Sequence, residues 1–101
     1  MKKCIILSEK DNIATVLLDV SKGEIVSIID NEFIERGIVT AIEDIPYMHK
    51  ICLKLILNKE DVVKSDCCIG IANGDINQGA LVHVNNTLSL VGTGAVAKEE
   101  V

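Results

Sequence analysis

The apolar residues of this 101-residue chain fall in short runs, which glycine, asparagine and acidic turn residues separate. The runs are rich in isoleucine and valine, and β-branched side chains pack well on the pleated surface of a sheet. The pattern predicts a small, mainly β domain. Strands are expected over Cys4–Leu7, Ala14–Val20, Glu24–Ile29, Gly37–Ile42, Ile51–Leu57, Cys67–Ala72 and Ala80–Val84, and Asn85-Asn86 turns the chain into one more run, Thr87–Val91.

The segments between these runs indicate how the strands connect. Lys22-Gly23-Glu24 separates the second and third runs and predicts a hairpin that joins them, because Gly23 is able to adopt a positive φ. The polar stretch Asp30–Gly37 is expected to be a loop. Ile51–Leu57 fits helical spacing as well as strand alternation, so a helix stays open there.

A short internal repeat accompanies the runs. Four matches in apolar runs are compatible with chance, but a repeated unit of a turn and its flanking runs would explain how so short a chain builds a β core. The matches, each 36 positions apart, are Leu17, Val20, Glu24 and Val26 with Leu53, Ile56, Glu60 and Val62.

Composition argues against two classes of partner. Fifteen acidic and ten basic residues give a formal net charge of −5, whereas non-specific nucleic-acid binding needs a basic face. Two aromatic residues, Phe33 and Tyr47, are too few for a platform on which bases stack. No apolar run approaches the ~20 residues that span a bilayer, and Cys4–Leu7 is too short for a signal peptide. We therefore expect a cytoplasmic protein that binds neither membrane nor nucleic acid.

The four cysteines form no C-x-x-C pair. In a reducing compartment they are expected to be free thiols at core or half-buried positions. If Cys67 and Cys68 lie on a strand, they point to opposite faces and cannot share a metal ion, so no metal site is expected. The length allows one domain, expected over residues 1–91, and residues 92–101 lack a core pattern and are expected to be a flexible C-terminal tail.

Two histidines are the residues best suited to chemistry. On an alternating strand, His83 would face away from Val82 and Val84, and Asn85 two positions on would complete a polar pair suited to a carboxylate, a sugar hydroxyl or a metal. His49 and Lys50 follow a proline, where they could bind an anion. From spacing alone an ordinary solvent-facing histidine is the favoured interpretation of His83, and His49 and Lys50 could also be ordinary residues on a rim. No catalytic triad, carboxylate dyad or metal triad is complete, so the residues alone name no reaction.

Three groups of residues nevertheless form a pattern whose order and spacing resemble the SAF domain of the altronate and galactarate dehydratases, a family of sugar-acid hydro-lyases. The resemblance runs from about Asp11 to Asn86. The groups are Asp11-Asn12-Ile13-Ala14 with Lys22-Gly23-Glu24; Ile45-Pro46-x-x-His49-Lys50; and Ile69-Gly70-x-Ala72 with Asp75-Ile76-x-x-Gly79 and Val82-His83-Val84-x-Asn86.

This resemblance implies a β-clip fold and a division of labour between two parts of an enzyme. The larger part holds the main dehydratase domain and, in several members, a divalent metal such as iron. Because this chain ends at Val101, we expect it to be the separate small subunit, without a cofactor of its own. The implied partners are the large dehydratase subunit and a small hydroxy-acid substrate, and a homo-oligomer stays open.

The resemblance also assigns expected roles to residues at the active-site cleft. His49 and Lys50 occupy the family motif Pro-x-Gly-His-Lys, and His83 and Asn86 occupy Val-His-x-His-Asn. His83 is expected to contact the substrate or transfer a proton, and Lys50 to neutralise a carboxylate. His49, Asn85 and Asn86 are expected to bind substrate, with both histidines on one face of the domain.

The sequence departs from the family pattern at five positions. The loss of a histidine at Asn85 matters most, because an amide binds a substrate but cannot shuttle a proton near neutral pH. The departures are Met48 for glycine, Asn85 for histidine, Lys59 for the glycine of a Gly-Glu turn, and Ser65-Asp66 for Tyr-Gly.

Three functions follow from these observations. The leading one is the small subunit of a lyase that removes water from a sugar acid after abstraction of the proton next to its carboxylate. The alternative is a stand-alone SAF module that binds a small molecule without turnover. The third is a purely structural β oligomer.

Overall fold

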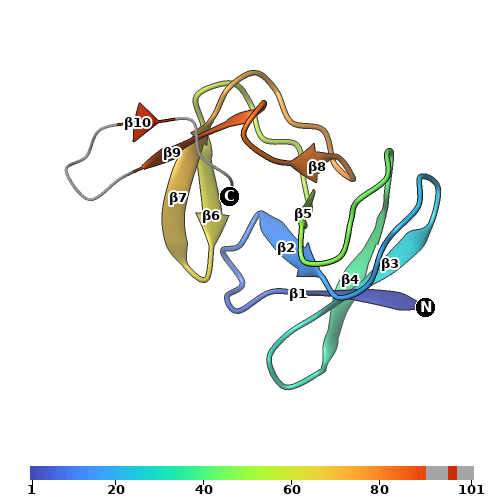
Figure 1. The fold of residues 1–101 in the computed structure, drawn as a ribbon. Coiled ribbons are helices and arrows are strands. Elements are labelled where there is room, and N and C mark those ends of the chain that lie inside the picture. Colours follow the sequence, from blue (N-terminus) through green and yellow to red (C-terminus); the bar gives the residue numbers. More distant parts are fainter. Residues whose placement is uncertain (91–95, 98–101) are drawn as a thin grey trace.

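The computed structural model describes residues 1–90 and 96–97, and all regular elements in them are strands (Figure 1). The prediction of a mainly β chain is therefore confirmed, and the fold fits the expected β-clip. The helical alternative for residues 51–57 is excluded. The strands are β1 (Lys2–Ile5), β2 (Ile13–Val16), β3 (Ile25–Ile29), β4 (Glu35–Thr40), β5 (Lys50–Cys52), β6 (Asp61–Lys64), β7 (Cys67–Ala72), β8 (Leu81–Val82), β9 (Thr87–Leu90) and β10 (Val96–Ala97).

The strands form two sheets, which lie side by side in Figure 1. The larger has the order β4-β3-β1-β2-β5-β8 and the smaller β10-β9-β7-β6. In the larger sheet β1 is antiparallel to β2 and parallel to β3. The predicted hairpin of the second and third runs is therefore wrong, because β1 lies between them. Gly23 does adopt a positive φ of 91°, but its amide donates to the carbonyl of Ala41 (2.8 Å), across the β3–β4 hairpin.

Several strands are shorter than predicted. β2 and β5 end at Val16 and Cys52, and beyond them the backbone pairs only through isolated bridges. β4 begins at Glu35, inside the stretch that was expected to be a loop. Of the predicted tail, the structure describes Val96–Ala97, which pair with β9, and the rest lies outside the described residues. Among the described residues no helix is long and apolar enough to cross a bilayer.

The core consists of two clusters of buried apolar side chains. One includes Cys4, Val16 and Ile51, and the other includes Cys52 and Val82. β5 contributes to both, because neighbouring residues on a strand point to opposite faces. Its position between the clusters fixes β5 and its partner β8 firmly, and the candidate site lies at their ends.

The internal repeat is confirmed by backbone hydrogen bonds. The amides of Val20 and Ile45 each donate to the carbonyl of the other residue (2.8 and 2.8 Å). Ile56 and Ile76 form the same pair of bonds (2.9 and 2.7 Å). Ile56 stands 36 positions after Val20, and Ile76 stands 31 positions after Ile45. The same offsets relate the other turn and bridge contacts between the two stretches, so the chain folds one small unit twice. The first repeat unit is residues 16–48 and the second repeat unit is residues 52–79.

Side chains of the two units are matched as well. In the first unit the Glu24 carboxylate accepts a hydrogen bond from the amide of Ser21 (2.7 Å). In the second unit the Glu60 carboxylate accepts one from the amide of Leu57 at the same distance (2.7 Å). Each glutamate thus holds the turn that precedes its strand. The offset of 36 in the sequence therefore marks equivalent places in space.

Asp11 and Asn12, part of the family pattern, join the two sheets. The buried side chain of Asn12 accepts from the amide of Val63 (2.7 Å) and donates to the carbonyl of Asp61 (2.9 Å), both on β6. The Asp11 carboxylate accepts from the amide of Asp66 in the β6–β7 turn (2.9 Å). These side chains replace the backbone pairing that an extra strand would supply.

Asp30, at the start of the β3–β4 loop, makes the fold less stable as the pH falls into the acid range. Hydrogen bonding from the amide of Ile34 (3.0 Å), followed by the ion pair with Arg36 (2.8 Å), holds the pKa of this carboxyl below its ordinary value. When the pKa of a carboxyl is lower in the folded chain than in the unfolded chain, its ionised form stabilises the fold. This stabilisation is fully present at a pH above the unfolded-state pKa and is lost as the pH falls through the folded-state pKa.

We therefore expect Asp30→Asn to lose less stability than the wild type between pH 6 and pH 2.5. Urea unfolding at both pH values measures the difference. Arg36→Gln keeps the amide hydrogen bonds and should fall between the two. Equal acid sensitivity in the wild type and Asp30→Asn would contradict the assignment.

Candidate functional site

The candidate site lies where β5 and β8 end together. Lys50 pairs with Val82 in this antiparallel ladder, and Ile51 pairs with Leu81. His49 directly precedes β5 and His83 directly follows β8, so the register brings both histidines to the same end of the ladder. Thirty-three residues separate them in the chain, yet they lie at one end of one ladder. The register thus joins two distant segments of the family pattern, and the shared face of the two side chains stays a prediction.

His49 is held by the turn that precedes β5. Its amide donates to the carbonyl of Pro46 (3.0 Å), and its carbonyl accepts from the amide of Val16 (2.9 Å). Its Nδ1 lies 3.3 Å from the carbonyl oxygen of Tyr47. A carbonyl only accepts, so Nδ1 carries the proton, and in neutral His49 the Nε2 atom is then an acceptor.

Met48 occupies the position where the family has glycine. The backbone conformation at this position explains the family's preference for glycine. Its φ is 68°, a left-handed conformation that costs an ordinary L-residue about 1–2 kcal/mol. The amide of Met48 donates to the carbonyl of Val16 (3.0 Å), which keeps the turn in place. The turn thus forms with methionine at the expense of strain.

We expect Met48→Gly to stabilise the fold by about 0.5–1 kcal/mol, since glycine adopts this φ without strain but loses more entropy on folding. Urea unfolding measures the change. Leu18→Gly, at a position just as exposed but without a positive φ, should instead be neutral or destabilising. If Met48→Gly fails to stabilise the fold, as is expected of Leu18→Gly, the backbone of Met48 is not strained.

His83 does not lie on a strand, which corrects the prediction. β8 ends at Val82, and residues 83–86 form a turn, so the expected alternation with Val84 does not hold. The physical reason is Asn86, whose side chain accepts from the amide of His83 (2.9 Å) and donates to the carbonyl of Leu81 (2.8 Å). These bonds compete with continued strand pairing and reverse the chain.

The turn also orients the imidazole of His83. Its Nδ1 accepts a hydrogen bond from the amide of Asn85 (3.3 Å). In neutral His83 the proton is therefore on Nε2, which is a donor. The two histidines thus present opposite hydrogen-bonding characters, with an acceptor Nε2 on His49 and a donor Nε2 on His83. His83 is half-buried and Asn85 is exposed.

Asn86 and Lys50 are placed differently with respect to a ligand. The side chain of Asn86 is engaged within the turn, and its carbonyl accepts from the amide of Asn73 (2.8 Å). It therefore positions His83. Lys50 is half-buried and pairs with Thr15 on β2. Thr15 lines a neighbouring cavity of about 270 Å³, whose lining residues are Ile5, Leu7, Asp11, Thr15, Leu17, Met48, Lys64 and Ser65.

The described residues contain no group of three histidine, cysteine or carboxylate side chains that could hold a metal ion. Cys4 and Cys52 are buried, and burial raises the pKa of their thiols to about 12 and about 11. Cys67 and Cys68 are exposed, so the expectation of core or half-buried positions is wrong for these two. They lie at the beginning of β7, which pairs with β6 on one side but extends beyond the residues that pair with β9 on the other.

Thiol titration should separate the two pairs. All four cysteines are free, so the denatured chain should titrate as four thiols. In the folded chain Cys67 and Cys68 should react fast and the two buried thiols slowly, because the thiolate is the reactive form. Cys67→Ser and Cys68→Ser should each remove one fast equivalent. Four equally fast thiols in the folded chain would contradict the burial of Cys4 and Cys52.

Comparison with known proteins agrees with this fold and these motifs. A family model described as the altronate/galactarate dehydratase SAF domain matches residues 2–90. The chain is similar to altronate dehydratase of Bacillus subtilis (strain 168), 36% identical over 92 residues that cover 86% of this chain and 16% of that protein. It is also similar to altronate dehydratase of Escherichia coli (strain K12), 38% identical over 77 residues that cover 76% of this chain and 14% of that protein.

Proposed function

Because the chain belongs to the SAF-domain family of the altronate and galactarate dehydratases, we propose that it is the small, non-autonomous part of a sugar-acid hydro-lyase. The chain spans only 16% and 14% of the length of the two relatives. We assign the main catalytic domain to a separate large chain, and the end of the β5–β8 ladder to the substrate. A cytoplasmic location is part of the same proposal.

The observation that supports this proposal is the β5–β8 register, which brings His49 and His83 to the same end of one ladder. In the dehydration of a hydroxy acid, a C–H bond next to the carboxylate and a C–O bond on the neighbouring carbon break, a C=C bond forms, and water leaves. The acceptor Nε2 of neutral His49 suits the proton that is taken, and the Nε2–H donor of neutral His83 suits a hydrogen bond to the hydroxyl. To protonate that hydroxyl so that it departs as water, His83 must be in its imidazolium form. We assign the donor role to His83, and substrate binding to His49 and Asn85.

Lys50 complements this pair by its charge. Abstraction of the proton next to a carboxylate develops further negative charge on it, and a nearby ammonium stabilises that charge. Asn86 acts through the turn that orients His83. The described residues do not fit a metal ion, so we place any divalent metal of the assembled enzyme, such as iron, in the large chain.

The exposed apolar residues of the first repeat unit support a large partner. Leu18 and Tyr47 stand two residues from the two ends of the Val20–Ile45 bridge and are 56% and 57% exposed. The equivalent positions of the second unit carry Lys54 and Gln78 on the same backbone. The fold therefore tolerates polar residues there, and the apolar pair is explained by contact with another chain.

The experiment that tests this function is reconstitution with a large dehydratase chain from the same source. The two chains should co-purify, and only their mixture should dehydrate altronate or a related sugar acid. The chain alone should show no turnover, with or without added iron or manganese. Leu18→Lys with Tyr47→Gln should weaken the complex without unfolding the chain. Turnover by the chain alone would refute the division of labour.

The alternative, a binding module without turnover, is favoured by one feature. Asn85 stands where the family motif has a second histidine, and an amide transfers no proton near neutral pH. Saturable binding of a sugar acid by the chain alone, together with no gain of turnover in any reconstituted complex, would support this alternative over the first.

A further inference from the structure

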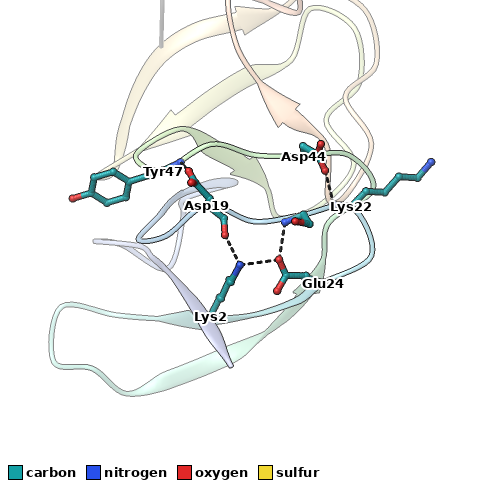
Figure 2. A network of polar contacts seen from close by, with 7 residues as sticks. Lys2, Asp19, Lys22, Glu24, Asp44 and Tyr47 are labelled. Carbon is teal, nitrogen blue, oxygen red and sulfur yellow. Dashed lines mark hydrogen bonds and ion pairs between the residues drawn. The ribbon is translucent and has the colours of Figure 1, made fainter.

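The two repeat units differ at one charged contact. In the first unit the Lys2 ammonium donates to the carbonyl of Asp19 (2.6 Å) and to the Glu24 carboxylate (2.9 Å), between which it lies in Figure 2. The hydrogen bond from Lys2 is the chief cause that lowers the pKa of Glu24. Lys2 comes from β1, which lies outside the unit and pairs with its β3. The first unit is therefore completed by an ammonium group from elsewhere in the chain.

The second unit repeats both acceptors. Leu55 and Glu60 stand 36 positions after Asp19 and Glu24. The Glu60 carboxylate is fixed by the amide of Leu57 at the same 2.7 Å that fixes Glu24 in the first unit. Among the described residues, Glu60 takes part in no ion pair, and no hydrogen bond reaches the Leu55 carbonyl. The acceptors that bind Lys2 in one unit thus recur in the other without a lysine from β1.

A cavity lies over these acceptors. It has a volume of about 600 Å³ and is lined by Asn12, Lys54, Leu55, Ile56, Lys59, Glu60 and Asp61. The segment that approaches β6 here is Asn12, whose short amide is bonded to the backbone of Asp61 and Val63. Where β1 brings Lys2 to the first unit, the second unit has only this asparagine. The cavity therefore leaves room for the ammonium group and its alkyl chain.

We propose that this cavity of the second repeat unit is a receptor for a primary ammonium group supplied from outside the chain. The ammonium donates to the Glu60 carboxylate and the Leu55 carbonyl, as Lys2 does to their equivalents. Two lysines and two acids line the cavity, so its formal charge is balanced and selectivity comes from the two fixed acceptors. A quaternary ammonium cannot donate and is not accepted.

The chemistry has two sources, a lysine side chain of a partner and a small free amine. An exposed pair of this kind contributes little free energy, so the isolated head group is expected to bind with a dissociation constant of about 10–100 mM. n-Butylammonium represents the free amine, and Nα-acetyllysine amide represents the side chain. Tighter binding of the lysine derivative points to a protein partner, and equal binding shows that the head group alone is recognised. Either result supports the receptor.

Amide chemical shifts of the full chain test the proposal. n-Butylammonium chloride should shift the amides of Leu57, Lys59 and Glu60 saturably, while tetramethylammonium and sodium chloride at equal ionic strength should not. Glu60→Gln keeps the acceptor for the Leu57 amide but removes the charge, and should weaken binding about two- to fivefold. Glu24→Gln is the matched control in the first unit, and it should leave binding unchanged.

Three results would overturn the proposal. The first is an equal response to butylammonium and tetramethylammonium, and the second is an equal response of Glu60→Gln and the wild type. The third is a response that appears only in Lys54→Ala with Lys59→Ala. It would mean that a lysine of the chain itself fills the site. None of these results depends on dehydratase activity, so the receptor and the proposed function stand or fall separately.

Discussion

Gly79→Ala is expected to destabilise the fold by about 3 kcal/mol or more. Gly79 adopts a φ of 86°, and a Cβ atom there would overlap the carbonyl oxygen of Thr40. The left-handed conformation costs an L-residue about 1–2 kcal/mol, and displacement of a packed backbone adds about 1–3 kcal/mol. A single domain is stable by only about 5–15 kcal/mol, so the loss is large. Urea unfolding of the variant and the wild type measures it.

Gly74→Ala separates the two contributions. Gly74 has nearly the same φ, 93°, but a Cβ atom there meets no atom within 4 Å. Its substitution should cost only the strain, about 1–2 kcal/mol. If Gly74→Ala and Gly79→Ala destabilise equally, close approach of the Thr40 backbone plays no part.

The repeat explains why Gly79 is glycine while its equivalent is not. Met48 holds the same place in the first unit, with a φ of 68°, and it is 52% exposed. The amides of both residues donate to equivalent carbonyls, of Val16 and Cys52 (3.0 and 2.8 Å). Gly79 also accepts from the amide of Ile42 in the first unit (3.0 Å), so it is enclosed between the units. Sequence motifs give both positions as turns, but only the packing of one unit on the other distinguishes them.

Local patterns predicted the strands better than their pairing. Short runs rich in β-branched residues identified most strands, because burial of such side chains is a local property. The hairpin around Gly23 was wrong because β1, far away in sequence, inserts between β2 and β3. A turn residue shows where the chain bends, but not which strand it meets afterwards. The 36-residue offset correctly related two turns of the same geometry, but it did not indicate which strands pair.

The candidate site was predicted in part for similar reasons. The motifs identified His49 and His83, and the β5–β8 register brings both to the same end of the ladder. The turn at residues 83–86 was missed, because Val82, His83 and Val84 alternate as a strand would. The side chain of Asn86 overrides that alternation with two hydrogen bonds to the backbone. Such a side-chain effect leaves no periodic signal in the sequence.

His83→Ala should lower turnover of the reconstituted enzyme by about 10²-fold or more, if His83 transfers a proton. Folding should change by only about 0.5–1 kcal/mol, because the turn is held by Asn86 and by the backbone of residue 83, which alanine keeps. Asn86→Ala is the structural contrast. It leaves the amide of His83 and the carbonyl of Leu81 without this partner and should cost about 1–3 kcal/mol.

His83→Gln separates proton transfer from binding. The glutamine amide donates a hydrogen bond, as the Nε2 atom of His83 does, but it transfers no proton near neutral pH. If His83 is an acid, kcat should fall as far in His83→Gln as in His83→Ala, while KM stays near that of the wild type. If His83 only binds substrate, His83→Gln should recover most of the turnover. Two results would contradict the assignment of the active site to this end of the β5–β8 ladder. One is full activity of His83→Ala, and the other is a structure of the complex with His49 and His83 on opposite faces.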